Sequence, residues 1–157
     1  MADKIIIANY GEPNTGKTKS IGLVYEYLSK VAEPGSPNVL RADNDDFCAI
    51  LVINGIKVGI ASQGDPWSHQ RVWIDLLIES GCVIIIAACR HYGATVRVIE
   101  SYADDFRIYW TCNARIYENG TDPRKEPDNE ILDRFNEQWA TEIANLIERL
   151  VLIGGVI

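Results

Sequence analysis

The sequence has no long apolar segment and little positive charge. Its 157 residues include 15 Lys and Arg against 22 Asp and Glu, which gives a formal net charge of −7. No apolar run reaches the roughly 18 residues that a transmembrane helix needs, and no charged and then apolar leader opens the chain. The acidic balance argues against a nucleic-acid partner, because nonspecific binding of that kind depends on Lys and Arg neutralising phosphates. We therefore expect a cytoplasmic protein without a membrane partner.

Recognisable cysteine patterns are also missing. The four cysteines are Cys48, Cys82, Cys89 and Cys112, and no two of them form a C-x-x-C pair. Three of them lie in or beside apolar runs, so we expect buried free thiols in a reducing compartment. A zinc site built from Cys82, Cys89 and His91 is an alternative, although its spacing matches no established ligand pattern. The sequence contains no internal repeat and no low-complexity segment. Its length suits a single domain over residues 1–157.

The strongest positive signal lies at residues 11–18, which match the phosphate-binding pattern G-x-x-x-x-G-K-[ST]. Residues 4–10 before it are predicted to form a short buried strand, and residues from Lys17 to about Ala32 an amphipathic helix. Glycines let such a loop turn tightly, its backbone N–H groups can face phosphate oxygens, and the helix N-terminus adds partial positive charge. The candidate ligand-binding residues are Gly11, Glu12, Pro13, Asn14, Thr15, Gly16, Lys17, Thr18 and Lys19.

At these residues the sequence resembles the P-loop NTPase superfamily. The resemblance covers about residues 4–32 and implies binding of a nucleoside triphosphate on a parallel-sheet α/β fold. In the mechanism that it implies, Lys17 reaches the β- and γ-phosphates and Thr18 places its hydroxyl on a magnesium ion. The resemblance does not identify a particular family.

Alternating strands and helices follow the motif and predict an α/β, three-layer P-loop NTPase fold with a mostly parallel sheet. Asn54-Gly55 between two β-branched runs predicts a hairpin, 47–53 with 56–62, whose first arm runs antiparallel to the rest. Val39 to Ala42 is either a short strand or an extended loop. A helix is predicted from Trp67 to Glu79, with Asp65 as its N-cap and Pro66 at the first helical position. The remaining predicted segments are a buried strand over 82–89, a helix over 95–104, a strand over 107–117, a loop over 118–128 and a helix over 129–150. An apolar stripe on the last helix is expected to face the core, formed by Ile131, Leu132, Phe135, Trp139, Ile143, Ile147 and Leu150.

This order of elements is also similar to that of the small GTPases, which belong to the same superfamily. The motifs by which those proteins read guanine are absent. Residues 65–68, Asp-Pro-Trp-Ser, stand in place of Asp-x-x-Gly, and residues 113–116, Asn-Ala-Arg-Ile, in place of Asn-Lys-x-Asp. The resemblance therefore implies the topology without guanine specificity.

Further candidate residues lie where the predicted strands end, because ligands of open α/β sheets bind beyond the carboxyl ends of the strands. Asp65 is predicted to be the second magnesium ligand beside Thr18, or simply a helix cap. The turn at 43–46, with Asp43, Asp45 and Asp46, reaches the same edge, and Asp43 and Asp45 are the alternative acids. Gln63 is a candidate for orienting an attacking water, and Arg90 for meeting a transferring phosphoryl group or a second substrate. Trp67 and Trp73 are expected in the core rather than as platforms for a base.

The sequence thus predicts a P-loop NTPase that binds magnesium and ATP or a similar triphosphate, with Lys17, Gln63 and Arg90 as catalytic residues. The reaction is triphosphate hydrolysis or phosphoryl transfer. One alternative is a small-molecule or nucleotide kinase, whose acceptor site would use Arg90. The other is a noncatalytic nucleotide-binding module that regulates a protein partner.

Overall fold

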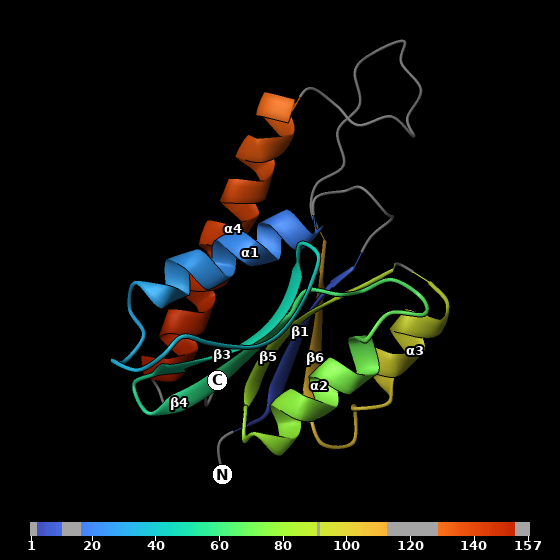
Figure 1. The fold of residues 1–157 in the computed structure, drawn as a ribbon, viewed down its shortest axis with the longest axis horizontal. Coiled ribbons are helices and arrows are strands. Elements are labelled where there is room, and N and C mark those ends of the chain that lie inside the picture. Colours follow the sequence, from blue (N-terminus) through green and yellow to red (C-terminus); the bar gives the residue numbers. More distant parts are fainter. Residues whose placement is uncertain (1–2, 11–16, 91, 113–128, 153–157) are drawn as a thin grey trace.

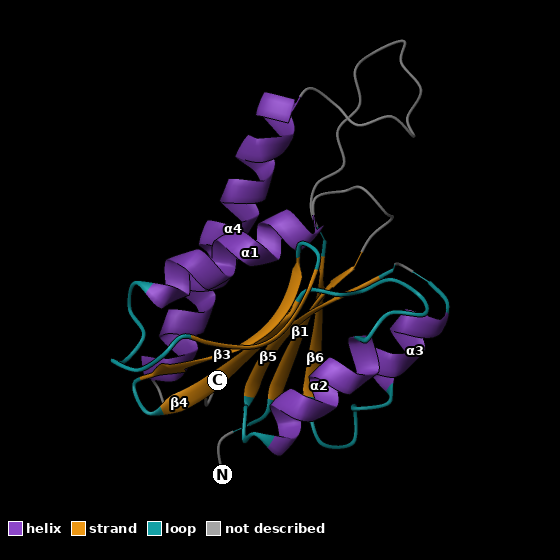
Figure 2. Ribbon diagram, viewed as in Figure 1, coloured by secondary structure: helices purple, strands orange, loops and turns teal. Residues whose placement is uncertain are grey.

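The chain forms a six-stranded sheet covered by helices on both faces (Figures 1 and 2). The computed structural model describes residues 3–10, 17–90, 92–112 and 129–152. The elements in chain order are β1 (Ile5–Tyr10), α1 (Lys17–Ser29), β2 (Asn38–Asp43), β3 (Asp46–Ile53), β4 (Ile56–Ala61), α2 (Gln70–Glu79), β5 (Ile84–Cys89), α3 (Ala94–Glu100), β6 (Arg107–Thr111) and α4 (Asn129–Leu152). Among the described residues, no helix combines the length and apolar character that crossing a membrane requires.

The strand order is β2-β3-β4-β5-β1-β6. Strands β4, β5, β1 and β6 pair in parallel, whereas β3 runs antiparallel to both β2 and β4. The predicted hairpin is confirmed, and its turn has positive φ at Asn54 (51°) and Gly55 (78°), as a two-residue turn between twisted strands requires. The expected mostly parallel α/β sheet is therefore present, with one antiparallel hairpin arm.

Two apolar clusters lie on opposite faces of the sheet, because side chains alternate along a strand. On β1, Ile5 and Ile7 pack towards α1 and α4, whereas Ile6 and Ala8 pack towards α2 and α3. All six residues of β5 are buried, as expected of a strand covered on both faces. Burying each large aliphatic side chain contributes about 1.5–3 kcal/mol. The central strands thus hold the carboxyl edge of the sheet in place.

The start of α2 differs from the sequence prediction. The helix begins at Gln70 and its N-cap is His69, whose side chain makes no cap hydrogen bond, so the predicted roles of Asp65 and Pro66 at the helix start are wrong. Trp67 has a φ of 65°, which interrupts any helix there, and its side chain is fully exposed rather than in the core. Trp73 is buried as predicted.

Helix α4 is two residues longer than predicted, and only the later part of its predicted stripe is buried. Ile143, Ile147 and Leu150 lie in the core, whereas Ile131 and Phe135 are exposed. Near its start α4 makes polar contacts with α1: Asp133 pairs with Lys19, and the Ser20 hydroxyl donates to the Asn136 side-chain oxygen at 3.1 Å. These contacts set the rotation of the helix and turn its first apolar residues outward.

The remaining predicted boundaries shift by a few residues. Helix α1 ends at Ser29, β5 begins at Ile84, and α3 ends at Glu100. Residues 38–43 form a strand, which settles the alternative left open there. Strand β6 ends at Thr111, and the predicted strand beyond it and the predicted loop over 118–128 fall on residues 113–128, outside the described residues.

Three of the four cysteines are buried, as the sequence predicts. Burial raises the pKa of Cys48 to about 11 and that of Cys82 and Cys89 to about 12, so their thiols stay protonated at neutral pH. Cys112 is exposed. His91, the third residue of the alternative zinc site, lies outside the described residues.

The difference in burial between Cys112 and the other three cysteines predicts selective thiol labelling. A disulfide reagent at pH 8 is expected to modify Cys112 rapidly and the three buried thiols only on unfolding, because the reactive species is the accessible thiolate. Absorbance of the released reagent counts the reactive thiols. Cys112→Ser should abolish the fast phase. A second fast thiol in the native protein would contradict the burial of Cys48, Cys82 or Cys89.

Candidate functional site

The described polar residues of the predicted site lie at the carboxyl edge of the parallel strands in two groups. Lys17 and Thr18 stand at the start of α1, whereas Gln63, Asp65 and Arg90 follow β4 and β5. Lys17 is the first residue of this helix and is 9% exposed. Lys17 lies close enough to Cys89, the last residue of β5, for its positive charge to act on that thiol. Burial raises the pKa of Cys89, and the charge of Lys17 partly opposes the rise. Residues Gly11, Glu12, Pro13, Asn14, Thr15 and Gly16 lie outside the described residues.

Thr18 belongs to a hydrogen-bond network that joins α1 to the β3–β4 hairpin. Its hydroxyl donates to the Asp46 carboxylate oxygen Oδ1 at 2.9 Å, and the Ser62 hydroxyl donates to the same oxygen at 2.8 Å. Ser62 in turn accepts from the backbone N–H of Phe47 at 2.9 Å. The hairpin makes this possible, because β3 starts at the edge where β4 ends. Thus a carboxylate 28 residues away in the sequence is fixed beside the motif hydroxyl.

Open space adjoins this network. A cavity of about 580 Å³ lies between the first turns of α1 and the turn that leads into β3, lined by Thr18, Lys19, Gly22, Asn44, Asp45, Asp46 and Phe47. A side chain at Gly22 would meet no atom within 4 Å. Thr18 and Asp46 therefore both border open space.

Gln63 is buried and makes hydrogen bonds through both ends of its side-chain amide. Its nitrogen donates to the Asp43 carboxylate at 2.8 Å, and its oxygen accepts from the backbone N–H of His69 at 2.9 Å. These bonds tie the last residue of β2 to the residue that precedes α2. In this arrangement Gln63 positions both segments, and orienting a water would require one of the bonds to exchange.

Asp65 lies beside Arg90. The Arg90 guanidinium Nε donates to the Asp65 carboxylate at 2.9 Å; the Arg90 side chain is 28% exposed and the Asp65 side chain 63%. The sequence prediction paired Asp65 with Thr18, whereas in the structure Thr18 bonds to Asp46 and Asp65 to Arg90. Asp65 and Arg90 thus form an ion pair at the edge between β4 and β5.

Gly64 explains how the segment after β4 reaches Arg90. A Cβ atom at this position would lie 2.5 Å from the carbonyl carbon of Ala88 and 2.6 Å from the nitrogen of Cys89, so only glycine allows the backbone to pass so close to β5. The backbone N–H of Arg90, just after the end of β5, donates to the Thr95 hydroxyl of α3 at 2.9 Å. Both contacts fix the backbone on which Asp65 and Arg90 stand.

The sequence reasoning did not single out Asp46 or Ser62, although a signal for them was present. Counting back from the two-residue turn at Asn54-Gly55 places Phe47 opposite Ser62, which is the register that the hairpin adopts. The same count brings Asp46 next to the end of β4. Hairpin register, rather than position in an acidic run, identifies the carboxylate.

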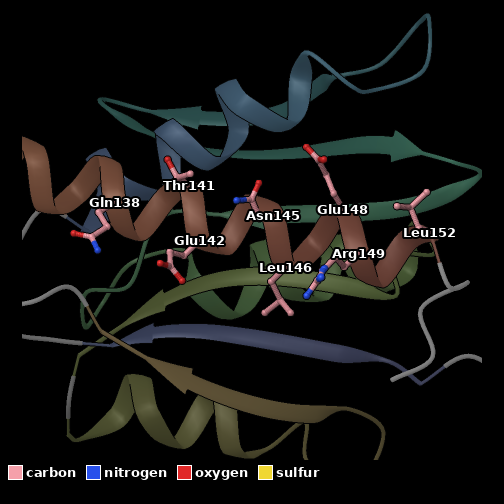
Figure 3. A pocket seen from close by; sticks show the side chains of 8 residues that line it. All are labelled: Gln138, Thr141, Glu142, Asn145, Leu146, Glu148, Arg149 and Leu152. Atoms are coloured by element: carbon pink, nitrogen blue, oxygen red, sulfur yellow. The ribbon is translucent and has the colours of Figure 1, made fainter.

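A second hollow, of about 780 Å³, follows the outer side of α4. Figure 3 shows that all eight of its described lining residues come from this one helix: Gln138, Thr141, Glu142, Asn145, Leu146, Glu148, Arg149 and Leu152. Lys17, Thr18 and Asp46 are not among them. This hollow is therefore lined by other residues than the predicted phosphate site.

No protein-family model, curated protein or solved structure matches this chain.

Proposed function

We propose that this protein binds a nucleoside triphosphate with magnesium, as a P-loop NTPase that carries out hydrolysis or phosphoryl transfer. The observation that carries the proposal is the 2.9 Å hydrogen bond from Thr18 to Asp46. It places a carboxylate beside the hydroxyl that ends the phosphate-binding pattern, and the buried Lys17 directly precedes that hydroxyl. Magnesium sites in such proteins combine a loop Ser or Thr with an acidic residue.

The oxygen atoms at Thr18 and Asp46 suit magnesium. This ion prefers oxygen ligands, keeps several of its waters, and is commonly held by one or two carboxylates together with substrate phosphates. Asp46 therefore takes the place that the sequence analysis gave to Asp65. When bound, magnesium would neutralise charge on the β- and γ-phosphates. Thr18 and Asp46 would hold it, directly or through its waters.

The other groups of the site have roles that follow from charge and position. The phosphate-binding pattern acts through backbone N–H groups that bind phosphate oxygens, and Lys17 would reach the β- and γ-phosphates. Arg90 would meet negative charge on the transferring group, because a guanidinium matches phosphate oxygens with two parallel bonds. The side chain would first leave Asp65, to which it is bonded. The partly exposed position of this ion pair makes that exchange feasible.

A binding and product assay tests this function. Calorimetric titration with ATP, GTP and dTTP in magnesium buffer should give saturable binding for at least one of them. Chromatography of the products, with and without candidate hydroxyl or phosphate acceptors, then separates hydrolysis from kinase activity. Failure of all three triphosphates to bind would reject the proposal.

Replacing Arg90 with alanine is expected to lower the catalytic rate about tenfold to a hundredfold, because a hydrogen bond to a charged group contributes about 1.5–3 kcal/mol, and to leave the Kd of Mg-ATP within about twofold. An interaction made only in the transition state affects the rate and not the binding of substrate. Steady-state kinetics and calorimetry measure the two effects. Arg97→Ala, on the exposed side of α3, is the matched control.

A different outcome of the same experiment favours the kinase alternative. If Arg90 holds an anionic acceptor, Arg90→Ala should raise the KM for that acceptor and spare basal hydrolysis. If neither the rate nor the KM changes, Arg90 has a structural role with Asp65, and the kinase alternative loses its main residue.

A further inference from the structure

A pocket lined partly by aromatic residues lies between α3 and the edge strand β6, on the side of β1 opposite to β5. It has a volume of about 270 Å³ and is lined by Tyr10, Val96, Glu100 and Trp110. Trp110 is in register with Ala8, so it lies on the face of the sheet that α3 covers, and Tyr10 follows two residues later on the same face. The two rings meet edge to face, with centroids 6.2 Å apart and planes at 76°. A ring surface at the sheet edge thus remains open.

The chemistry of this pocket suits a flat ring that carries N–H donors. Trp110 is 41% exposed although it packs against Tyr10, which leaves area for another ring to stack on it. Val96 adds an apolar wall. Glu100 lies one helical turn after Val96 in an exposed position, where its carboxylate oxygens can accept hydrogen bonds. Aromatic surface and an acceptor together favour a base with an amino group.

The position of this pocket relative to the phosphate-binding motif also suits a nucleotide. Tyr10 is bonded covalently to Gly11, the first residue of the motif. In the strand order, β6 lies on one side of β1, whereas β5, β4 and β3 lie on the other. The aromatic pocket and the Thr18–Asp46 network are therefore on opposite sides of β1. A nucleotide likewise has its metal-binding phosphates at one end and its base at the other.

We propose that this pocket binds the nucleobase of the triphosphate and prefers bases with an exocyclic amino group. The inference rests on the proposed function and adds the residues that select the base. The base stacks on Trp110, and the Glu100 carboxylate accepts a hydrogen bond from the amino group. Adenine, guanine and cytosine carry that group, whereas uracil and thymine carry a carbonyl oxygen that the carboxylate repels.

Titration calorimetry with ATP and with inorganic tripolyphosphate, in magnesium buffer, separates the base from the phosphates. Trp110→Ala should weaken ATP about fivefold to a hundredfold and leave tripolyphosphate within about twofold, because stacking acts only on the base. Trp110→Phe keeps a ring and should stay within about threefold of the wild type for both ligands. Tyr109→Ala is the matched control, since this neighbour is similarly exposed but lies on the opposite face of β6.

The contribution of Glu100 is tested with a matched pair of ligands. CTP and UTP differ at the ring position where one carries an amino group and the other a carbonyl oxygen. The wild type should bind CTP more tightly, and Glu100→Gln should reduce that preference about fivefold or more, because the amide loses the charged acceptor. Glu79→Gln, an exposed carboxylate on α2, should keep the preference.

The possible failures are distinguishable. If Trp110→Ala weakens ATP and tripolyphosphate equally, or weakens neither, the base pocket is overturned while the phosphate site stands. Equal affinity of the wild type for CTP and UTP overturns the role of Glu100. If the wild-type protein binds neither ATP nor tripolyphosphate, the proposed function fails, and the base pocket fails with it.

Discussion

Lys17→Ala is expected to weaken Mg-ATP binding about a hundredfold or more. A hydrogen bond to a charged group contributes about 1.5–3 kcal/mol, and the ammonium is expected to reach both the β- and the γ-phosphate, so about two such contacts are lost. Lys17 is 9% exposed and stands at the first position of α1, where its charge reinforces the helix N-terminus. Calorimetry with Mg-ATP measures the loss, and circular dichroism confirms that the variant is folded.

Lys30→Ala controls for the loss of a positive charge. Lys30 directly follows α1, is exposed, and holds its ammonium over the ring of Tyr27. An exposed cation–π contact of this kind contributes about 0.5–1 kcal/mol, so this variant should be close to the wild type in stability and should lose far less affinity. Wild-type affinity of Lys17→Ala for Mg-ATP would reject the phosphate-binding role of the motif.

Asp46→Asn is expected to raise the magnesium concentration needed for half-maximal binding or activity about 10- to 100-fold, the usual cost of altering a group that supports a metal site. Asparagine keeps the shape of the side chain and removes the negative charge. It also weakens the acceptor for the hydroxyls of Thr18 and Ser62, both of which bond to the same carboxylate oxygen. A magnesium titration at fixed ATP measures the shift.

The control for this experiment is Asp65→Asn. Asp65 is mostly exposed and bonded to Arg90, so its replacement should leave the magnesium requirement within about twofold and cost about 1 kcal/mol of stability or less. Thr18→Ala should resemble Asp46→Asn. A shift in the magnesium requirement with Asp65→Asn, together with none for Asp46→Asn, would return the metal role to Asp65.

The sequence was a reliable guide to the elements whose signals are local. Asn54-Gly55 predicted the hairpin because few residue pairs tolerate positive φ at both positions, and the continuous apolar run predicted the buried strand β5. The start of α2 was not readable in this way. Asp65 and Pro66 are favourable helix-start residues, but Asp65 bonds to Arg90 and Gln63 holds His69, so tertiary contacts set the helix start.

In the candidate site, too, features with a local sequence signal differ from those that depend on tertiary contacts. The motif singles out Lys17 and Thr18 because it depends on a short run of residues, and their ligand-binding role stays a prediction. The carboxylate next to Thr18 depends on which strands are neighbours and in what register, and neither is encoded within a short window. Asp65 follows the apolar run of β4 and was the natural choice, yet the antiparallel arm brings Asp46 to Thr18. The exposure of Trp67 was equally unreadable, since it follows from a positive φ in one loop.

The most direct test of the central claim compares Mg-ATP, ATP with excess chelator, and AMP in one calorimetric series on the wild-type protein. If Lys17, Thr18 and Asp46 form a triphosphate site, Mg-ATP should bind saturably with one site per chain. Removing magnesium should weaken ATP binding, and AMP, which lacks the β- and γ-phosphates, should bind much more weakly. Equal binding of AMP and Mg-ATP, or no binding of Mg-ATP, would contradict the claim.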